Sequence, residues 1–298
     1  MIRIIALGTS GSMPTPKSPP SCFAVKWGGV YLFDCCEGAQ RQMMKYNASF
    51  AGIDAIFLSH LHADHFVGIF GLLHSMNFTG RTNALKLFGP HGTKKLFSSI
   101  FALKEFTMRF PIEILEVEAS KKPFFQNDLF AVKAFDVKHN APHSLGYVLQ
   151  GLSYRRFDME KCKKLGVQGK DFSALQEKGE IMANGKKVKY ADVTYIQDGK
   201  KIVYTGDTAP CPAIAANAKN ADLLIHDACF LEKHKAHAKQ KLHSTCLDAG
   251  KNAKKAKVKK LLLTHFSNRY DDQTELLKES KTVFENSELA QPGLEIMI

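Results

Sequence analysis

DAIFLSHLHADHFVGIFGLL, residues 54–73, carries the local patterns that decide both the fold and the chemistry. The stretch opens with an apolar run typical of a buried strand and closes with an apolar segment typical of a helix. Side chains two residues apart in an extended loop point to the same side, and a fourth can turn back where the helix begins. Imidazoles and carboxylates are the ligands of catalytic zinc, and they also suit manganese and iron. We therefore expect a metal site formed by His60, His62, Asp64 and His65.

Further ligands are expected where other predicted strands end. His139 follows the run FAVKAFDVK, Asp207 ends KIVYTGD and His265 ends KKLLLTH. These side chains gather at one sheet edge if the strands are neighbours. His143, in the same segment as His139, is the nearest competing ligand. The set divides into two metal sites bridged by Asp207, with His60, His62 and His139 on one ion and Asp64, His65 and His265 on the other.

A binuclear site of this kind suits phosphodiester cleavage. Two ions about 3.5–4 Å apart lower the pKa of bound water to about 7, and the hydroxide so formed is the nucleophile. Both ions also neutralise the negative charge that builds on the phosphoryl oxygens.

Composition limits the class of protein. The chain has 298 residues, 45% hydrophobic and 23% charged, which excludes a largely disordered chain, a collagen and a coiled coil. A chain of this length buries a large core without a structural metal, so a metal site is expected to be chemical. The formal charge of +12 suggests an anionic partner. Seven cysteines without a CxxC pair suggest reduced thiols, and with neither a transmembrane run nor a signal peptide we expect a cytoplasmic protein without membrane contact.

The remaining pattern is that of an α/β fold with one insertion. From about 151 to 199 the apolar content falls, and ten residues of this segment are Lys or Arg. We interpret it as a basic arm, with an ordinary surface excursion as the alternative, and expect a hairpin turn at Asn184-Gly185. The patterns predict strands at 2–7, 21–27, 30–34, 54–59, 84–89, 112–118, 129–137, 145–150, 201–207, 221–227 and 258–265, and helices at 37–47, 66–78, 158–166, 211–219, 244–256 and 273–284.

Several motifs together resemble a known family. HLHADH with its distal His, Asp and His is similar to the metallo-β-lactamase superfamily. More closely, the chain resembles the tRNase Z (ribonuclease Z) family nearly from end to end. The motifs that carry this resemblance are ALGTSGSMPT (6–15), LFDCCEGAQRQM (32–43), SHLHADHFVGIFGLL (59–73), HNAPHSLGY (139–147), TGDT (205–208), HST (243–245) and LLLTHFSNRY (261–270).

The resemblance implies a single catalytic domain over 1–298, an αββα metallo-β-lactamase sandwich with the basic arm inserted at 151–199. It also implies a homodimer with two zinc ions per subunit, manganese being an alternative, and the same seven ligands. His139 rather than His143 matches the family's distal histidine. The implied reaction is removal of the 3′ trailer from precursor tRNA by hydrolysis, leaving a 3′-hydroxyl on the tRNA.

The resemblance also implies roles for individual residues. Asp64 is the proton acceptor for the attacking water, and His243 is the proton donor to the leaving 3′ oxygen or a clamp on the phosphate. HDAC (226–229) stands where the family has HEAT, so Asp227 replaces a glutamate that orients His243, or it only caps a loop. The arm segment 163–180 lacks the family's Gly-Pro motif. Candidate tRNA contacts are Arg269 and Tyr270, for which a local salt bridge is the alternative, and in the arm Lys163, Lys164 and Lys170.

The metal motif is also compatible with other functions. A small-molecule phosphodiesterase, an arylsulfatase-like hydrolase or a thioesterase has the same metal motif but needs a closed pocket and no basic arm. A non-catalytic RNA-binding protein would be expected to lack ligands, whereas all seven are present. The surplus histidines are interpreted as structural or solvated: His74, His91, His143, His226, His234 and His237.

Overall fold

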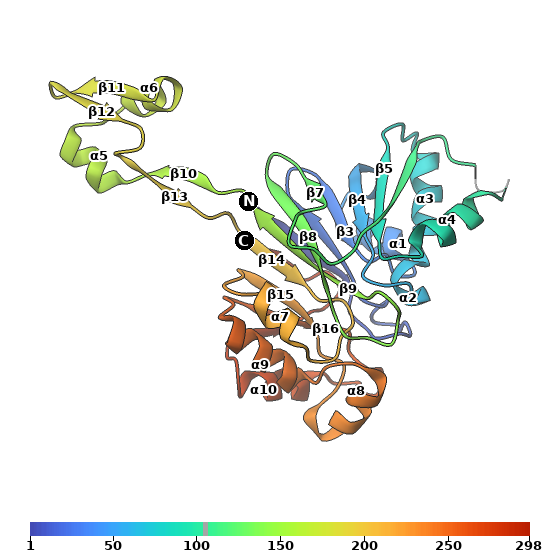
Figure 1. Ribbon diagram of the computed structural model, residues 1–298. Helices are drawn as coiled ribbons and strands as arrows, with labels where there is room; N and C mark the ends of the chain where they lie inside the picture. Colours follow the sequence, from blue (N-terminus) through green and yellow to red (C-terminus); the bar gives the residue numbers. More distant parts are fainter. Residues whose placement is uncertain (104–106) are drawn as a thin grey trace. The chain divides into compact units, whose positions relative to one another are not determined.

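The computed structural model describes residues 1–103 and 107–298 (Figure 1). The chain forms two compact units, one of residues 1–150 with 201–298 and one of residues 151–200. Within the described residues, none of the helices is long and apolar enough to span a membrane.

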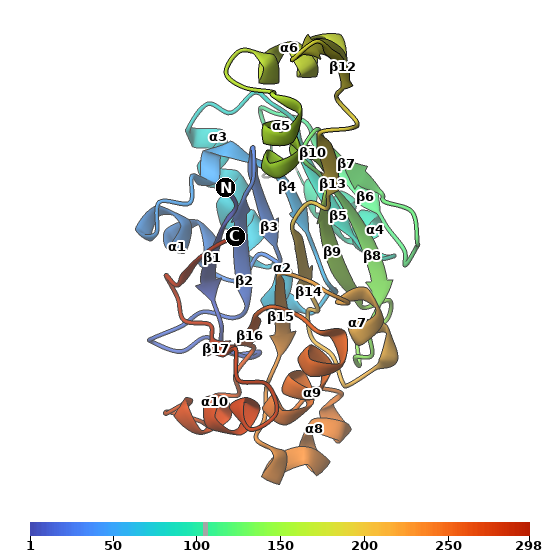
Figure 2. The same ribbon diagram turned by 90° about the vertical axis from the view of Figure 1, so that its left-hand side faces the viewer.

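Two mixed sheets form the centre of the larger unit (Figures 1 and 2). Most inner strands of each sheet are buried on both faces, which is why they are nearly continuous apolar runs, whereas the edge strands are partly exposed. The first sheet has the order β18 (Glu295–Met297), β1 (Arg3–Gly8), β2 (Cys22–Lys26), β3 (Val30–Phe33), β4 (Ile53–Phe57), β5 (Leu85–Gly89) and β6 (Ile112–Glu116). The second has the order β17 (Ser287–Leu289), β16 (Leu261–Thr264), β15 (Leu223–Asp227), β14 (Lys201–Tyr204), β9 (Leu145–Gly151), β8 (Phe130–Asp136) and β7 (Phe125–Gln126).

Helices cover the outer face of each sheet, so the predicted αββα sandwich is confirmed. On the first sheet lie α1 (Ala39–Lys45), α2 (Ala63–Phe66), α3 (Gly68–Phe78) and α4 (Thr93–Phe101). On the second lie α7 (Pro212–Asn217), α9 (Cys246–Ala256) and α10 (Thr274–Lys281). The short η1 (Phe50–Gly52), η2 (Glu232–His234) and α8 (Lys235–Lys241) complete this unit. Between the sheets, an aromatic core includes Phe33, Phe57, Tyr147 and Tyr204.

Some element boundaries differ from the prediction for local reasons. The first helix begins at Ala39 rather than residue 37, because Gly38 takes a left-handed φ of 71° in front of it. The helix predicted at 66–78 is preceded by α2, whose single turn holds Asp64 and His65. The helices α4, α6 and α8 were not predicted.

The smaller unit, residues 151–200, has its own core. It contains β10 (Tyr154–Phe157) paired with β13 (Thr194–Gln197), and β11 (Glu180–Ala183) paired with β12 (Lys186–Lys189). Its helices α5 (Met159–Leu165) and α6 (Asp171–Lys178) pack on buried side chains that include Cys162, Leu175 and Val188. The predicted hairpin turn is confirmed, because Asn184 and Gly185 both have positive φ between the paired residues Ala183 and Lys186.

Candidate metal centre

The predicted ligands come together at one edge of the two sheets. His60 and His62 lie between β4 and α2, and Asp64 and His65 lie in α2. His139 follows β8, Asp207 follows β14 and His265 follows β16. The strands β4, β14 and β16 each have a parallel neighbour, and their carboxyl ends bring the loops that follow them to the same edge.

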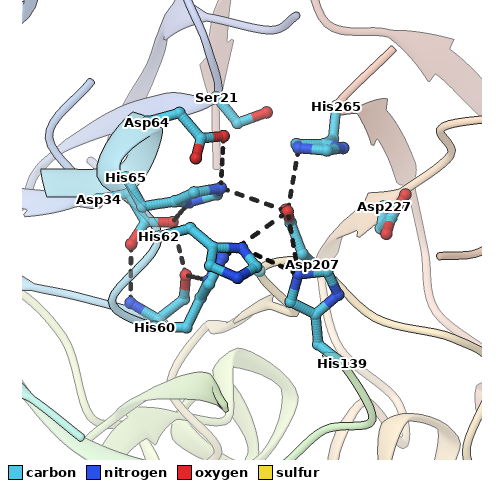
Figure 3. A network of polar contacts seen from close by, with 12 residues as sticks. Ser21, Asp34, His60, His62, Asp64, His65, His139, Asp207, Asp227 and His265 are labelled. Carbon is cyan, nitrogen blue, oxygen red and sulfur yellow. Dashed lines mark hydrogen bonds and ion pairs between the residues drawn. The ribbon is translucent and has the colours of Figure 1, made fainter. Parts of the chain in front are cut away.

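Asp207 lies in the middle of the cluster (Figure 3). Its Oδ2 lies 3.0 Å from Nε2 of His265, 3.3 Å from Nε2 of His65, 3.8 Å from Nε2 of His139 and 3.9 Å from Nε2 of His60. The ligating atoms form two triads, within each of which all atoms are within 4.8 Å of one another: His60, His62 and His139, and Asp64, His65 and His265. These triads correspond to the division expected from the sequence, but two further groups of ligating atoms cross it: His60, His65 and Asp207, and His139, Asp207 and His243.

A buried carboxylate beneath the cluster sets which ring nitrogens face inward. Oδ2 of Asp34 accepts hydrogen bonds from His65 Nδ1 (2.7 Å), Ser59 Oγ (2.8 Å) and Tyr204 Oη (2.6 Å). Because the Ser59 hydroxyl gives its proton to Asp34, His60 Nδ1 must donate to Ser59 Oγ across 3.0 Å. In their neutral forms His65 and His60 therefore carry the proton on Nδ1, and the lone pair of Nε2, on the side of Asp207, is available to a metal.

Two residues of the centre have strained backbones. Asp34 has a φ of 57° and His265 a φ of 63°, in the left-handed region that non-glycine residues rarely adopt. Such a conformation costs about 1–3 kcal/mol at each residue, and it persists where the surrounding structure enforces it. Seven other non-glycine residues of the described chain also have a positive φ, so this conformation by itself does not mark the centre.

The electrostatics of the cluster are dominated by burial and by Asp207. Burial would raise the pKa of Asp207, but His265 and His65 hold it well below the usual value. Burial lowers the pKa of His265, but Asp207 more than offsets this and raises it to about 8. Burial and the neighbouring His65 keep the pKa of His60 well below its ordinary value. In the absence of metal, protons on some imidazoles balance the buried carboxylate, so metal ions and protons compete for this centre.

The residues present fit a divalent metal. Five buried atoms of the cluster have no hydrogen-bond partner among the described residues: Nε2 of His60, Nε2 of His65, Oδ1 of Asp207 and both ring nitrogens of His265. Buried polar atoms are almost always satisfied, and here they converge on common points. A set of imidazoles and carboxylates with unused lone pairs is what a divalent transition metal or zinc requires.

His243 lies beside this centre and is held by Asp227. Nδ1 of His243 is 2.7 Å from Oδ2 of Asp227, so the aspartate reaches the histidine although it is shorter than the glutamate of the resembled motif. Asp227 is fully buried and also accepts hydrogen bonds from the backbone N–H groups of Thr208 and Cys229. A cavity of about 340 Å³ opens here, and its lining includes His62, His139, His237, Lys241, His243 and His265.

The candidate tRNA contacts are of two kinds: Arg269 and Tyr270 contact neighbouring side chains, whereas the three lysines of the smaller unit are exposed. The hydroxyl of Tyr270 bonds to Nδ1 of His234 at 2.6 Å and accepts from the N–H of Leu231, so it holds the polypeptide locally. The guanidinium of Arg269 lies over the ring of Phe230. In the smaller unit, Lys163 and Lys164 are exposed on α5, and Lys170 is exposed in front of α6.

Sequence reasoning missed Asp34, Ser59 and Tyr204 as partners of the ligands, and Lys241 and His237 as residues of the cavity wall. For Asp34 and Ser59 a signal existed, because each follows a predicted buried strand directly and Ser59 precedes the first ligand. For the other residues the sequence offers no local signal.

The fold and the metal centre are those of the metallo-β-lactamase superfamily. The family model described as the β-lactamase superfamily domain matches residues 30–157 and 174–266. Ribonuclease Z of Methanosarcina acetivorans is 41% identical, with 100% of this chain and 98% of that protein covered. Ribonuclease Z of Myxococcus xanthus is 37% identical, over 96% and 94%. The crystal structure of human tRNase Z, short form, superposes with a TM-score of 0.72 at 25% identity, covering 99% of each chain. The chain belongs to the ribonuclease Z family.

Proposed function

We propose that this protein is a metal-dependent endoribonuclease that removes the 3′ trailer from precursor tRNA and leaves a 3′-hydroxyl on the tRNA. The observation that carries the proposal is the complete set of seven ligands around Asp207, with His243 beside it, in a chain of the ribonuclease Z family. When bound, the metal ions would acidify a water molecule and neutralise charge on the phosphoryl oxygens.

The chain's own residues supply the proton transfers. Asp64 is partly exposed, its Oδ2 lies 3.3 Å from Nε2 of His65, and it accepts the proton of the attacking water. Burial would raise the pKa of Asp64, but the hydrogen bond with His65 brings it below the usual value, so the carboxylate is ionised near neutral pH. As water attacks the phosphorus, the bond to the 3′ oxygen of the tRNA breaks.

His243 donates a proton to that leaving 3′ oxygen. The bond between its Nδ1 and Asp227 orients the ring and stabilises the imidazolium form, leaving Nε2 as the donating nitrogen. Clamping of the scissile phosphate is the second role open to His243. A clamp acts mainly on substrate binding, whereas a proton donor acts mainly on the rate of the chemical step.

Two zinc ions per subunit are proposed, one on each triad, with manganese as an alternative ion. The support is the division of the ligands into two triads that Asp207 separates. Metal analysis of the purified protein tests both the identity and the number. A content of one ion per chain would contradict the binuclear assignment.

The smaller unit, residues 151–200, is proposed to bind the tRNA backbone through Lys163, Lys164 and Lys170. A sharp test replaces Lys163 and Lys164 by glutamate, with glutamate at Lys121 and Lys122 as the matched control, since these are also adjacent exposed lysines. We expect weaker tRNA binding and a lower salt dependence only in the first variant, since each phosphate contact contributes about one unit to the salt slope. Equal effects of the two variants would show that only the net charge of the protein, and not the position of the lysines in the arm, contributes to tRNA binding.

Deletion of the arm separates RNA recognition from chemistry. Gln150 and Lys201 face each other across β9 and β14, so an Asn-Gly turn can replace residues 151–200. We expect this variant to hydrolyse bis(p-nitrophenyl) phosphate and to lose cleavage of precursor tRNA. Unchanged cleavage would argue against the arm as a binding site.

A homodimer and a cytoplasmic location complete the proposal. The dimer follows from the family resemblance, and sedimentation of the purified protein tests it. The seven cysteines, all of which lie within the described residues and are free, support a reducing compartment.

The decisive experiment is cleavage of a 5′-labelled precursor tRNA with a short 3′ trailer, with and without a chelator and added zinc or manganese. We expect one chelator-sensitive cut directly after the discriminator nucleotide. The absence of a cut with any metal, together with hydrolysis of small diesters, would favour a small-molecule phosphodiesterase, an alternative that family membership does not favour.

A further inference from the structure

A second group of ligating side chains adjoins the metal centre. Atoms of Asp227, Cys229, His243 and His265 all lie within 4.8 Å of one another. Asp227 ends β15, Cys229 follows it, His243 precedes α9 and His265 follows β16. Cys229, His243 and His265 also line the cavity beside the centre. In the proposed reaction Asp227 and His243 act on protons, and Cys229 has no role.

The chemistry of this group suits a soft divalent cation. One carboxylate and one thiolate would together balance the charge of the ion, and two imidazoles would complete four ligands, the usual number for zinc. The thiolate distinguishes this group from the two triads, which contain only imidazoles and carboxylates, because thiolate favours zinc and cadmium over manganese and magnesium. Asp227 is fully buried and Cys229 is only 4% exposed, so little water competes for the ligands.

One ring nitrogen of His265 is not used by the metal centre described above. This side chain is buried, and neither ring nitrogen has a hydrogen-bond partner among the described residues. Its Nε2 lies 3.0 Å from Asp207, which accounts for one nitrogen through the centre described above. In Figure 3 a dashed line joins one ring nitrogen to Asp207, and the other ring nitrogen does not face Asp207. A cation held on the Asp227 side would satisfy the remaining nitrogen, Nδ1.

We propose that Asp227, Cys229, His243 and His265 form a third metal site for zinc or cadmium, which fills only when metal is in excess. Binding releases three protons to solvent: the thiol proton of Cys229, the proton shared between His243 and Asp227, and the remaining ring proton of His265, which holds one ion on each nitrogen. The site is weaker than the triads because its ion lies close to the metal ions bound there, and like charges repel.

Occupation of this site has a consequence for activity that rests on the proposed function. His243 cannot hold a proton for the leaving oxygen while the group holds a metal ion. Excess zinc therefore inhibits the enzyme that lower zinc activates. Cys229 sets this sensitivity, since it is the member of the group that neither the triads nor the proton transfer requires.

The test titrates the full chain, already loaded with zinc, with cadmium alone. The variant is Cys229→Thr, which keeps a side chain of similar size. The matched control is Cys211→Ser, a free and partly exposed cysteine in front of α7 and outside the group. The readouts are the ultraviolet charge-transfer band of cadmium-thiolate and the number of ions bound. Thermal unfolding checks that each variant is folded.

We expect the band and one additional ion in the wild type and in Cys211→Ser, and neither in Cys229→Thr. We also expect the zinc concentration that inhibits tRNA cleavage to rise at least about tenfold in Cys229→Thr, because loss of a group that merely orients a ligand already costs about 10–100-fold in affinity. A band of equal size in Cys229→Thr would overturn the proposal. If Cys229→Thr does not fold, cadmium NMR of the wild type decides, and a spectrum without a thiolate-bound ion overturns the site. Failure of tRNA cleavage alone would leave the spectroscopic result standing and would count against the proposed function.

Discussion

Replacing Asp34 by asparagine should reverse the protonation of His65. The carboxylate accepts four hydrogen bonds, from the N–H and hydroxyl of Ser59, from Nδ1 of His65 and from the hydroxyl of Tyr204. In Asp34→Asn the backbone N–H of Ser59 retains an oxygen acceptor, but an amide N–H now faces Nδ1 of His65. The imidazole must then accept at Nδ1 and carry its proton on Nε2, the nitrogen that faces Asp207. A protonated Nε2 has no lone pair for a metal.

The size of the effect follows from these contacts. Loss of a group that orients a ligating histidine lowers metal affinity by about 10–100-fold, and we expect about 100-fold because the tautomer is reversed. Hydrogen bonds to charged groups contribute about 1.5–3 kcal/mol against about 1 kcal/mol for neutral ones. The bond from the Ser59 N–H becomes neutral, and the amide NH2 can donate to at most two of the three groups that Oδ2 accepted from, so the free energy of unfolding of the metal-free protein should fall by at least about 3 kcal/mol.

Competition with a chromophoric chelator measures the metal affinity, and denaturant unfolding measures the stability. Tyr204→Phe is the matched control, because it removes one donor to Asp34 and leaves the bond to His65 intact. We expect Tyr204→Phe to lose about 1.5–3 kcal/mol of unfolding free energy while its metal affinity stays near that of the wild type. Wild-type metal affinity in Asp34→Asn, or equal loss of metal in both variants, would refute the assignment of the tautomer.

Three further predictions concern other parts of the molecule. His243→Ala should slow cleavage by about 10²–10⁴-fold with metal content near normal, as measured by single-turnover kinetics and metal analysis; loss of metal would make His243 a ligand instead. Gly68→Ala should lower the free energy of unfolding by about 3 kcal/mol, because its Cβ would lie 1.7 Å from the carbonyl oxygen of Cys36; unchanged denaturant unfolding would contradict this packing. Burial lowers the pKa of His226, and its Nε2 accepts a hydrogen bond from Asn252. The unfolded chain therefore binds the proton more readily than the folded protein. The free energy of unfolding should fall as the pH drops below about 6.5, by at most about 1.4 kcal/mol per pH unit. His226→Gln should flatten that part of the stability curve between neutral pH and about pH 5.5, and an unchanged slope would show that other groups cause it.

The ligand set could be predicted because its signals are local. His60 to His65 lie within one strand-loop-helix stretch, and each distal ligand directly follows an apolar run. The structure adds only that these strand ends meet at one edge. The pattern of apolar strands alternating with helices also predicts sheets that are covered on at least one face, whereas the αββα layering was implied by the family resemblance.

The supporting contacts could not be predicted because they join distant parts of the chain. Tyr204 reaches Asp34 across the interface of the two sheets, 170 positions apart in sequence. That contact depends on how the sheets face each other, which no local pattern encodes. The sequence of α8, KAHAKQK, has only two small apolar residues, of which Ala238 is buried, so nothing in it indicates that His237 and Lys241 line a cavity.

The attachment of the smaller unit has a consequence for how this family can vary. Residues 151–200 leave and re-enter the second sheet at Gln150 and Lys201, which are paired partners on adjacent strands. A segment of any length or shape inserted there changes neither the register of β9 and β14 nor the loops that carry the ligands. Changes in the arm and changes at the metal centre therefore fall in separate stretches of the gene. A single insertion or deletion at this point alters the arm and leaves every ligand of the metal centre in place.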